Sequence, residues 1–336
     1  MQRTRILIPV LVAALCALPG AGTAQQKLAQ TGMKFLNVIT DARTMSLGGA
    51  VTALEQGASS LFFNPAGMAR TSSVADFTIG RVQWIADIRH DYVSAAISPF
   101  NGEYGVLGLM IHSVNYGKLD GTIRSTTNAA GFIDLGQFSP YALMVGVGYA
   151  RVLSDKFAVG GAVKWVRQDL GSGVVALVTS GYTKSGNVAD LYAFDFGLNY
   201  HTGFKSLQFG MAIRNFSKEA RFIDEGFQLP LTFKIGAAMD VLDFASVDQG
   251  MHKLVVGIDA EHPRDFVETV QVGAEYLYDN MLAFRTGFVS HADEHQFSFG
   301  LGLQLDPGLY RAGLDYAYTP FGIFDNVHTF TLKLTF

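Results

Sequence analysis

The residues best suited to metal chemistry are His291 and His295, which lie four positions apart with Asp293 and Glu294 between them. On a helix, two histidines at this spacing share one face and can bind zinc. Here they fall between two segments with the alternating pattern of β-strands, and no metalloprotease motif surrounds them. We therefore interpret them as part of a solvated loop, and we expect no metal site and no cofactor.

Motifs for other chemistry are also missing from the sequence. It contains no Gly-x-Ser-x-Gly elbow, no phosphate-binding loop and no paired cysteines, since Cys16 is the only cysteine. The net charge of −4 does not fit the basic surface of a nucleic-acid-binding protein. We expect a protein that is not an enzyme and that does not bind nucleic acid.

Charged residues do occur at positions that alternate with large apolar side chains. If these segments are strands, the charges share the face opposite to the apolar one. Both signs are present, so we expect them to pair across a polar interior, although a proton or ion relay is an alternative without specific support. The residues are Lys164, Asp195, Arg214, Lys234, Asp259, Glu275, Arg285, Arg311, Asp315 and Lys333.

Alternation is the dominant pattern from about residue 75 onward. In 191–200, for example, Tyr192, Phe194 and Phe196 fall on one face, and Asp195 falls on the other. The chain is 49% hydrophobic and only 16% charged, yet after the N-terminus it has no apolar run long enough for a membrane-spanning helix. A soluble sandwich would bury the apolar face against a second sheet, whereas a membrane barrel exposes it to lipid.

Counting these segments predicts an all-β fold, a transmembrane antiparallel β-barrel of about fourteen strands. An even strand number is typical of closed bacterial barrels. The expected strands are 75–85, 91–100, 104–114, 138–152, 156–167, 191–200, 206–216, 231–242, 251–262, 266–278, 281–290, 294–305, 309–319 and 328–336.

The connections between these strands alternate in length. Short turns rich in Asn, Asp, Gly and Pro fall on one side, and long connections at 115–137, 168–190 and 217–230 fall on the other. Outer-membrane barrels have short periplasmic turns and long external loops, so we place the chain end, Phe336, in the periplasm. The connection near 243–250 is long for a periplasmic turn.

The N-terminus has the layout of a secretory signal peptide. Arg3 and Arg5 precede an apolar run over 6–18, and small residues follow up to Ala24, after which we place cleavage. The mature protein would then lack cysteine. We expect a signal peptide at 1–24, an N-terminal plug or hatch segment at 25–74 and a barrel at 75–336, in the outer membrane of a bacterium with two membranes.

The segment before the barrel does not alternate and contains a series of short motifs. Phe-Leu at 35–36 and Ala-Arg at 42–43 precede a Met-x-x-Gly-Gly-Ala element at 45–50 and an Ala-Ser-x-x-x-x-Asn-Pro-Ala-Gly-Met element at 58–68. This order resembles the PorV/PorQ family of outer-membrane barrels associated with type IX secretion. That family is similar in turn to the FadL long-chain fatty-acid transporters, which have fourteen strands and an N-terminal hatch with an Asn-Pro-Ala element.

The resemblance implies that the motif residues shape a plug or hatch and are not catalytic. The residues that match are Gly48, Gly49, Asn64, Pro65, Ala66 and Gly67. The matching motifs span roughly residues 35 to 68. Over the whole chain, the resemblance lies in the barrel architecture alone.

The resemblance implies one of two functions. A secretion accessory would sit in outer-membrane lipid and bind the translocon, or cargo proteins with a C-terminal sorting domain, through apolar residues of its external loops. Those contact candidates, which could instead cap the barrel, are Phe132, Ile133, Val174, Val175, Phe222 and Phe227. The alternative is a FadL-like transporter of hydrophobic small molecules, which a bulged strand opposite the plug would favour. An enzyme of lipid chemistry would need a nucleophile and base that we do not find.

Overall fold

The computed structural model describes residues 31–336 apart from residues 55, 72, 179–180, 223–225 and 293–294. Within this part of the chain, fourteen antiparallel strands form one closed barrel, which confirms the predicted fold class. The barrel closes where β1 (Ala75–Gln83) pairs with β18 (Val327–Thr335), so the first and last strands are neighbours. The predicted signal peptide and its cleavage position lie outside the described residues.

The other twelve barrel strands are β2 (Arg89–Ile97), β3 (Val106–Asn115), β6 (Tyr141–Ser154), β7 (Phe157–Val178), β8 (Gly181–His201), β9 (Gln208–Ser217), β12 (Thr232–Asp240), β13 (His252–Pro263), β14 (Thr269–Tyr278), β15 (Leu282–Val289), β16 (Phe297–Leu305) and β17 (Arg311–Thr319).

The alternating sequence becomes an inside and an outside of the barrel. In β16, Phe297, Phe299 and Leu301 are exposed on the outer surface, whereas Ser298 and Gly300 between them face the interior and are buried. Successive side chains of a strand point to opposite faces, so each barrel strand contributes an apolar outer row and a small or polar inner row.

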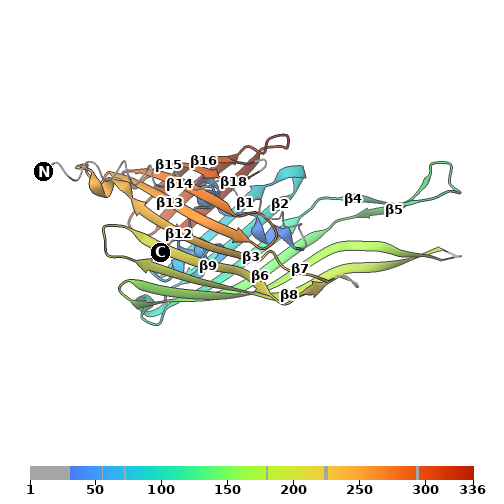
Figure 1. Ribbon diagram of the computed structural model, residues 1–336, viewed down its shortest axis with the longest axis horizontal. Coiled ribbons are helices and arrows are strands. Elements are labelled where there is room, and N and C mark those ends of the chain that lie inside the picture. Colours follow the sequence, from blue (N-terminus) through green and yellow to red (C-terminus); the bar gives the residue numbers. More distant parts are fainter. Residues whose placement is uncertain (1–30, 55, 72, 179–180, 223–225, 293–294) are drawn as a thin grey trace, which may run out of the picture.

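The two ends of the barrel differ. At the short-turn end, connections such as 155–156 and 279–281 join neighbouring strands, and the C-terminus lies at the same end. At the opposite end, which we call the long-arm end, β4 (Leu119–Arg124) pairs with β5 (Phe132–Phe138), and β7 and β8 continue to pair beyond the barrel. Figure 1 shows these two pairs projecting from the same end of the molecule.

Three connections that the sequence presents as loops therefore contain paired strands. The connection over 115–137 holds β4 and most of β5, that over 168–190 holds the extended ends of β7 and β8, and that over 217–230 holds β10 (Ala220–Arg221) and β11 (Gly226–Phe227). Antiparallel pairing satisfies the backbone hydrogen bonds of a long connection, which explains why these segments are ordered as hairpins.

Short helices occupy the N-terminal part and some turns. They are η1 (Lys34–Asn37), α2 (Ala42–Ser46), η2 (Gly57–Phe62), η3 (Pro65–Met68), η4 (Ile85–Asp87), η5 (Pro99–Gly102) and η6 (Val241–Phe244). The connection near 243–250, which is long for the short-turn end, begins with η6. The Asp240 side chain caps η6 by accepting a hydrogen bond from Leu242 N. In the described part of the chain, every helix is too short or too polar to cross a membrane.

Candidate functional site

Residues 31–54 and 56–71, which we call the lumenal segment, lie inside the barrel and contact its inner wall. Their apolar side chains are almost completely buried; Phe35 and Leu36 are 4% exposed, and Leu61 and Met68 are 0% exposed. They form one hydrophobic cluster with inward-facing side chains of the strands, Met110 among them. The interior next to these strands is therefore occupied by the protein's own N-terminal chain.

A row of inward-facing glycines lets the backbone of the lumenal segment approach the wall. These glycines, the glycine track, lie on five consecutive strands of the sheet and are Gly210, Gly236, Gly257, Gly273 and Gly287. Gly210 is opposite Gly236 in the sheet, and Gly273 is opposite both Gly257 and Gly287.

The distance from a Cβ atom placed on each glycine of the track shows how closely the lumenal segment approaches the wall. A Cβ atom at Gly210 would lie 2.1 Å from the carbonyl oxygen of Thr52, and one at Gly287 would lie 2.1 Å from the backbone nitrogen of Gly48. Contacts below 3.0 Å are too short for a real Cβ atom. Any larger residue here would have to displace the lumenal segment.

Gly48 and Gly49, which the family resemblance predicts to be plug residues, lie where this segment turns against the wall. Both have left-handed backbone conformations, with φ angles of 62° and 84°. A Cβ at Gly48 would lie 3.1 Å from the Phe288 backbone nitrogen. The left-handed conformation and the tight space both favour glycine at these two positions.

The Asn-Pro-Ala-Gly element forms the start of η3. Asn64 caps it, because its Oδ1 accepts a hydrogen bond from Ala66 N at 3.1 Å, and Pro65 follows in the first turn. The Asn64 amide also donates to Thr52 O and to Asn199 Oδ1, both at 2.6 Å. This element thus ties two parts of the lumenal segment to the wall.

The neighbouring glycine has a local packing role. A Cβ at Gly67 would lie 2.7 Å from the Ser60 hydroxyl and 3.1 Å from the Leu54 carbonyl oxygen, both of which belong to the lumenal segment. The six motif residues therefore lie in one buried segment, and none of them forms a constellation of nucleophile and base.

A buried group of charges joins α2 to the wall. Glu275 lies between two arginines, with Oε1 2.7 Å from Arg43 Nη2 and Oε2 2.5 Å from Arg285 Nε. Arg285 Nη1 is in turn 2.7 Å from Asp315 Oδ1. Arg43 belongs to the lumenal segment, whereas its partners belong to β14, β15 and β17, so the ion pairs fix the segment to these strands.

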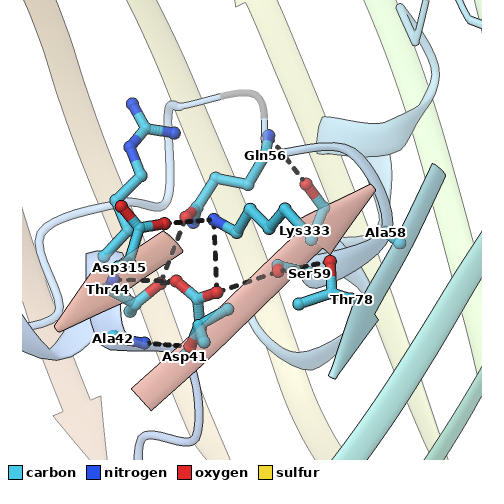
Figure 2. Close-up of polar contacts among 12 residues, drawn as sticks. Asp41, Ala42, Thr44, Gln56, Ala58, Ser59, Thr78, Asp315 and Lys333 are labelled. Atoms are coloured by element: carbon cyan, nitrogen blue, oxygen red, sulfur yellow. Dashed lines mark hydrogen bonds and ion pairs between the residues drawn. The ribbon is translucent and has the colours of Figure 1, made fainter. Parts of the chain in front are cut away.

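Figure 2 shows how the same group of charges continues to Asp41. Lys333 Nζ lies 3.5 Å from Asp315 Oδ2 and 3.3 Å from Asp41 Oδ2. Asp41 also caps α2 by accepting from Thr44 N, and it accepts a hydrogen bond from the Ser59 hydroxyl at 3.0 Å. Burial alone would raise the pKa of Asp41, but Lys333 and these hydrogen bonds hold it below its usual range.

Most of the charges predicted to face the interior do pair there. Lys164 Nζ is 2.7 Å from Asp195 Oδ2, and Asp259 accepts hydrogen bonds from the backbone and hydroxyl of Thr52. Arg311 does not face the interior, and the prediction for it was wrong. It lies exposed at the short-turn end, where it pairs with Asp306 at 3.1 Å, because the strand begins at that residue.

A cavity of about 490 Å³ lies between the lumenal segment and the wall at the long-arm end. Apolar side chains such as Met45, Phe266 and Phe321 contribute to its lining, together with a smaller number of charged ones. Lys34 and Thr31 of the lumenal segment donate hydrogen bonds to Asp265 at its rim. Burial would raise the pKa of Asp265, but these two hydrogen bonds hold it below its usual range.

The loop contact candidates fall into three groups. Phe132 and Ile133 are exposed on β5 of the projecting pair. Phe222 and Phe227 instead stack on each other, with centroids 5.0 Å apart, and pack against the hydrophobic cluster of the lumenal segment. Val174 and Val175 lie in the extended part of β7. Of the candidates whose side chains the structure describes, Phe222 and Phe227 stack on each other and cover the interior.

The two histidines considered for metal binding are separated in environment. His291 is exposed in the connection between β15 and β16, whereas His295 lies flat against Phe321, with centroids 4.6 Å apart, and lines the cavity. Among the residues that the structure describes, no three His, Cys, Asp or Glu side chains group as a metal site.

The sequence reasoning missed Asp41 and the cavity. Asp41 had a usable signal, because an aspartate directly before a short helical stretch is a typical N-cap. The cavity had none, since its lining residues come from the N-terminal segment, from several barrel strands and from four connections, all far apart in the chain.

The chain was compared with known proteins. The family model described as type IX secretion system protein PorV matches residues 21–259, which is more than half of the chain. No protein among those with curated descriptions matches the chain.

Solved structures with a similar fold include transporters of low sequence identity. The Ralstonia pickettii toluene transporter TbuX is 13% identical, covers 89% of this chain and 99% of its own, and has a TM-score of 0.58. The Pseudomonas putida toluene transporter TodX is 12% identical, with 92% and 98% covered and a TM-score of 0.57. A Pseudomonas aeruginosa FadL homologue is 10% identical, with 93% and 99% covered and a TM-score of 0.50.

At such identities the likeness concerns the fold alone, and the fold is that of the FadL-like barrels. Together with the family match, the closed barrel with its apolar outer surface places the protein in an outer membrane. The match over most of its length shows that this chain belongs to the PorV family of type IX secretion system proteins.

Proposed function

We propose that this protein is an accessory of type IX secretion that binds exported cargo or the translocon through its long-arm end, which we place outside the cell. The observation that carries this proposal is the contrast between an interior that the lumenal segment largely occupies and projecting arms with exposed apolar side chains, together with the family match. Phe132 and Ile133 are 47% and 43% exposed on an arm beyond the barrel. Exposed apolar groups in such a position commonly mark protein contacts.

The lumenal segment supports a role as a binding platform. Its buried ion pairs and its contacts with the glycine track leave a folded protein cargo no passage through the barrel. Cargo would therefore engage the outer surface, and the protein would act without catalysis. In this proposal residues 25–74 are the plug and residues 75–336 the barrel, with residues 1–24 removed on export.

The test compares the surface and secreted proteomes of a deletion strain and its parent by mass spectrometry. We expect proteins with a C-terminal sorting domain to be lost from the surface and to accumulate in the periplasm. An unchanged surface proteome would refute the secretion role.

The arm itself is tested by complementing the deletion strain with Phe132→Ser/Ile133→Ser. The control is Leu309→Ser, which removes an apolar side chain that is even more exposed, at 90%, at the short-turn end. Loss of surface cargo in the arm variant alone, at equal amounts of folded protein, is the expected result. Equal cargo levels in both variants would remove the arm from the proposal.

A second candidate function is transport of a hydrophobic small molecule. It is favoured by a bulge in the wall: Phe194 pairs with Phe216 and Phe196 with Ile213, so β9 holds one extra residue there. Arg214, next to this bulge, lines the cavity of about 490 Å³. The similar barrels TbuX and TodX are described as toluene transporters. If uptake of labelled toluene fell in the deletion strain while the surface proteome stayed unchanged, transport would be established as the function instead.

A further inference from the structure

The outward surface of β1 and β2 carries charges on the face that the wall turns to lipid. Arg81 and Asp91 lie opposite each other in the sheet, and their side chains are 51% and 41% exposed. The next outward pair toward the short-turn end, Ile79 and Val93, is apolar and exposed. Outward positions of a membrane barrel are normally apolar, so this charged pair interrupts the pattern of the wall.

Two arginines share the carboxylate of Asp91. Arg81 Nε donates to Asp91 Oδ1 at 2.5 Å, and Arg89 Nε lies 3.4 Å from Asp91 Oδ2. Among the described residues, no second carboxylate lies within ion-pair distance of either arginine. A guanidinium has five N–H groups, so one shared carboxylate leaves donors of both side chains available to another anion.

Further polar side chains extend this group along the rim of the wall. Gln83 of β1 is exposed and lies opposite both Arg89 of β2 and His328 of β18. His328 stacks on Tyr316, and its Nδ1 is 2.8 Å from the Tyr316 hydroxyl. Arg81, Gln83, Arg89 and His328, which we call the polar row, therefore come together from three adjacent strands at the long-arm end.

An apolar groove of about 600 Å³ adjoins the polar row on the outside of the barrel. It crosses the adjacent strands β3, β2, β1, β18 and β17, and Arg81 and Asp91 contribute to its lining. Most of the lining consists of exposed outward side chains, which are Ile79, Val93, Ile111, Leu314, Phe330 and Leu332. The groove thus opens to the membrane, on the opposite face of the wall from the lumenal segment.

A cationic rim beside an apolar groove is complementary to a lipid with an anionic head group. A groove in the lipid-facing wall is reached from within the membrane, and an acyl chain matches its apolar lining. Arginine binds phosphate oxygens through parallel hydrogen bonds, and arginine clusters beside a membrane surface attract anionic lipids. A lipid with a cationic group beside its phosphate would gain less from the same two arginines.

We propose that β1, β2 and β18 form a binding site for an anionic phospholipid, whose phosphate pairs with Arg81 and Arg89 while one acyl chain lies in the groove over Ile79, Val93 and Leu332. This site requires neither of the functions proposed above. Lipid binding is measured on the purified protein, so its failure and that of a secretion or transport role are distinguishable.

The experiment titrates the full mature chain, purified in a neutral detergent, with dioleoylphosphatidylglycerol and counts bound lipids by native mass spectrometry. Dioleoylphosphatidylcholine has the same acyl chains and a phosphate, but its choline group makes it neutral overall. Glycerol phosphate, which lacks acyl chains, separates the binding of a lipid from the binding of phosphate alone. Every variant is first checked for the folded form by its mobility on gels without heating.

We expect one molecule of phosphatidylglycerol to bind more tightly than phosphatidylcholine, without displacement by glycerol phosphate. Arg81→Gln/Arg89→Gln should weaken phosphatidylglycerol binding roughly tenfold to thirtyfold and leave phosphatidylcholine binding unchanged. The control is Arg167→Gln, which removes another outward arginine of the long-arm end that pairs with Asp190 and is not part of the groove lining. It should have no effect. Val93→Trp, which fills the groove, should weaken the binding of both lipids.

Four outcomes would overturn the proposal. They are equal affinity for the two lipids, displacement of phosphatidylglycerol by glycerol phosphate, an equal loss in the double variant and in Arg167→Gln, and unchanged phosphatidylglycerol binding in Val93→Trp. If the double variant does not fold, the comparison of the two lipids on the unaltered protein and on Arg89→Gln decides the question.

Discussion

The lumenal segment meets two parts of the barrel wall by different physical means. Near β2, β3 and β6 it presents Leu61, Phe62 and Met68 to inward-facing apolar side chains. Near β14 to β18 it presents Asp41 and Arg43 to a chain of buried charges. Apolar contact stabilises without fixing a direction, whereas buried ion pairs stabilise little in total but require one geometry. The first part holds the segment, and the second part sets its position.

The largest expected effect comes from the glycine track, which lies on β9 and β12 to β15 between these two parts of the wall. Gly287→Val would place a side chain where the backbone of Gly48 now lies, so we expect almost no folded barrel in the membrane. The control is Gly313→Val, an inward-facing glycine where a Cβ would lie 3.6 Å from its nearest neighbour. Mobility on gels without heating measures the folded fraction. Equal folding of both variants would show that the lumenal segment can move aside.

Next in size is the charged part. Glu275→Gln would leave Arg43 and Arg285 buried with one carboxylate fewer, and we expect the free energy of unfolding to fall by about 3–5 kcal/mol. Urea unfolding in lipid vesicles measures this change. Removing the exposed Arg311 pair through Arg311→Gln should cost less than about 1 kcal/mol. If Glu275→Gln lowered the free energy of unfolding by as little as Arg311→Gln does, the buried charges would not be what fixes the lumenal segment.

The apolar part should respond in a graded way. Leu61→Ala would leave a cavity beside Gly108 and Gly148, and we expect a loss of about 2–4 kcal/mol in the same unfolding assay. Leu61→Met keeps the volume and should cost less than about 1.5 kcal/mol. If Leu61→Ala were neutral, the apolar contact would not be what retains the segment.

Acid provides a finer test of the charged part. Because the pKa of Asp41 is lowered in the folded protein, its contribution to stability is complete above its ordinary pKa near 3.8 and is lost as the pH falls through the lowered value. Asp41→Asn should therefore lose less stability than the parent between pH 4 and pH 2. Asp134→Asn, at an exposed site on β5, should follow the parent curve, and identical curves for all three would exclude Asp41 as a contributor.

The smallest effect on stability is expected for substitutions on the projecting arms, because their side chains are exposed whereas those of the interior are buried. Phe132→Ser/Ile133→Ser should change the free energy of unfolding by less than about 0.5 kcal/mol, since both side chains are already exposed. A loss comparable to that of Leu61→Ala would mean that the arm packs against the barrel.

Much of the barrel could be predicted from the sequence because a strand imposes a period of two on its side chains. The alternation of Tyr192, Phe194 and Asp195 separates the outer face of the strand from its inner face, even when the neighbouring strands are unknown. The arms could not be separated from loops in this way, because β4 and β5 are solvated on both faces and show no such period.

The interior was harder to predict, because its contacts join residues far apart in the sequence. Gly287 alternates with apolar neighbours like any inward residue, and nothing local shows that Gly48 lies against it. Phe222 and Phe227 have the composition of an exposed apolar loop, yet they stack over the interior. The sequence specifies the type of each side chain, whereas the pairing depends on how the closed barrel brings distant strands together.

The position of the lumenal segment also bears on how the barrel closes. Ala42 N donates to Thr331 Oγ1 on β18, while Ala58 N donates to Asp76 Oδ1 on β1. Joining Asp76 to Thr335 directly closes a loop of 259 residues. If α2 docks on β18 first, that contact closes a loop of 289 residues. The loop that then remains between β1 and β18 is roughly 40 residues, so the entropic cost of the last closing step is about 2 kcal/mol lower. The segment inside the barrel would thus act as a template that guides its two ends together during assembly.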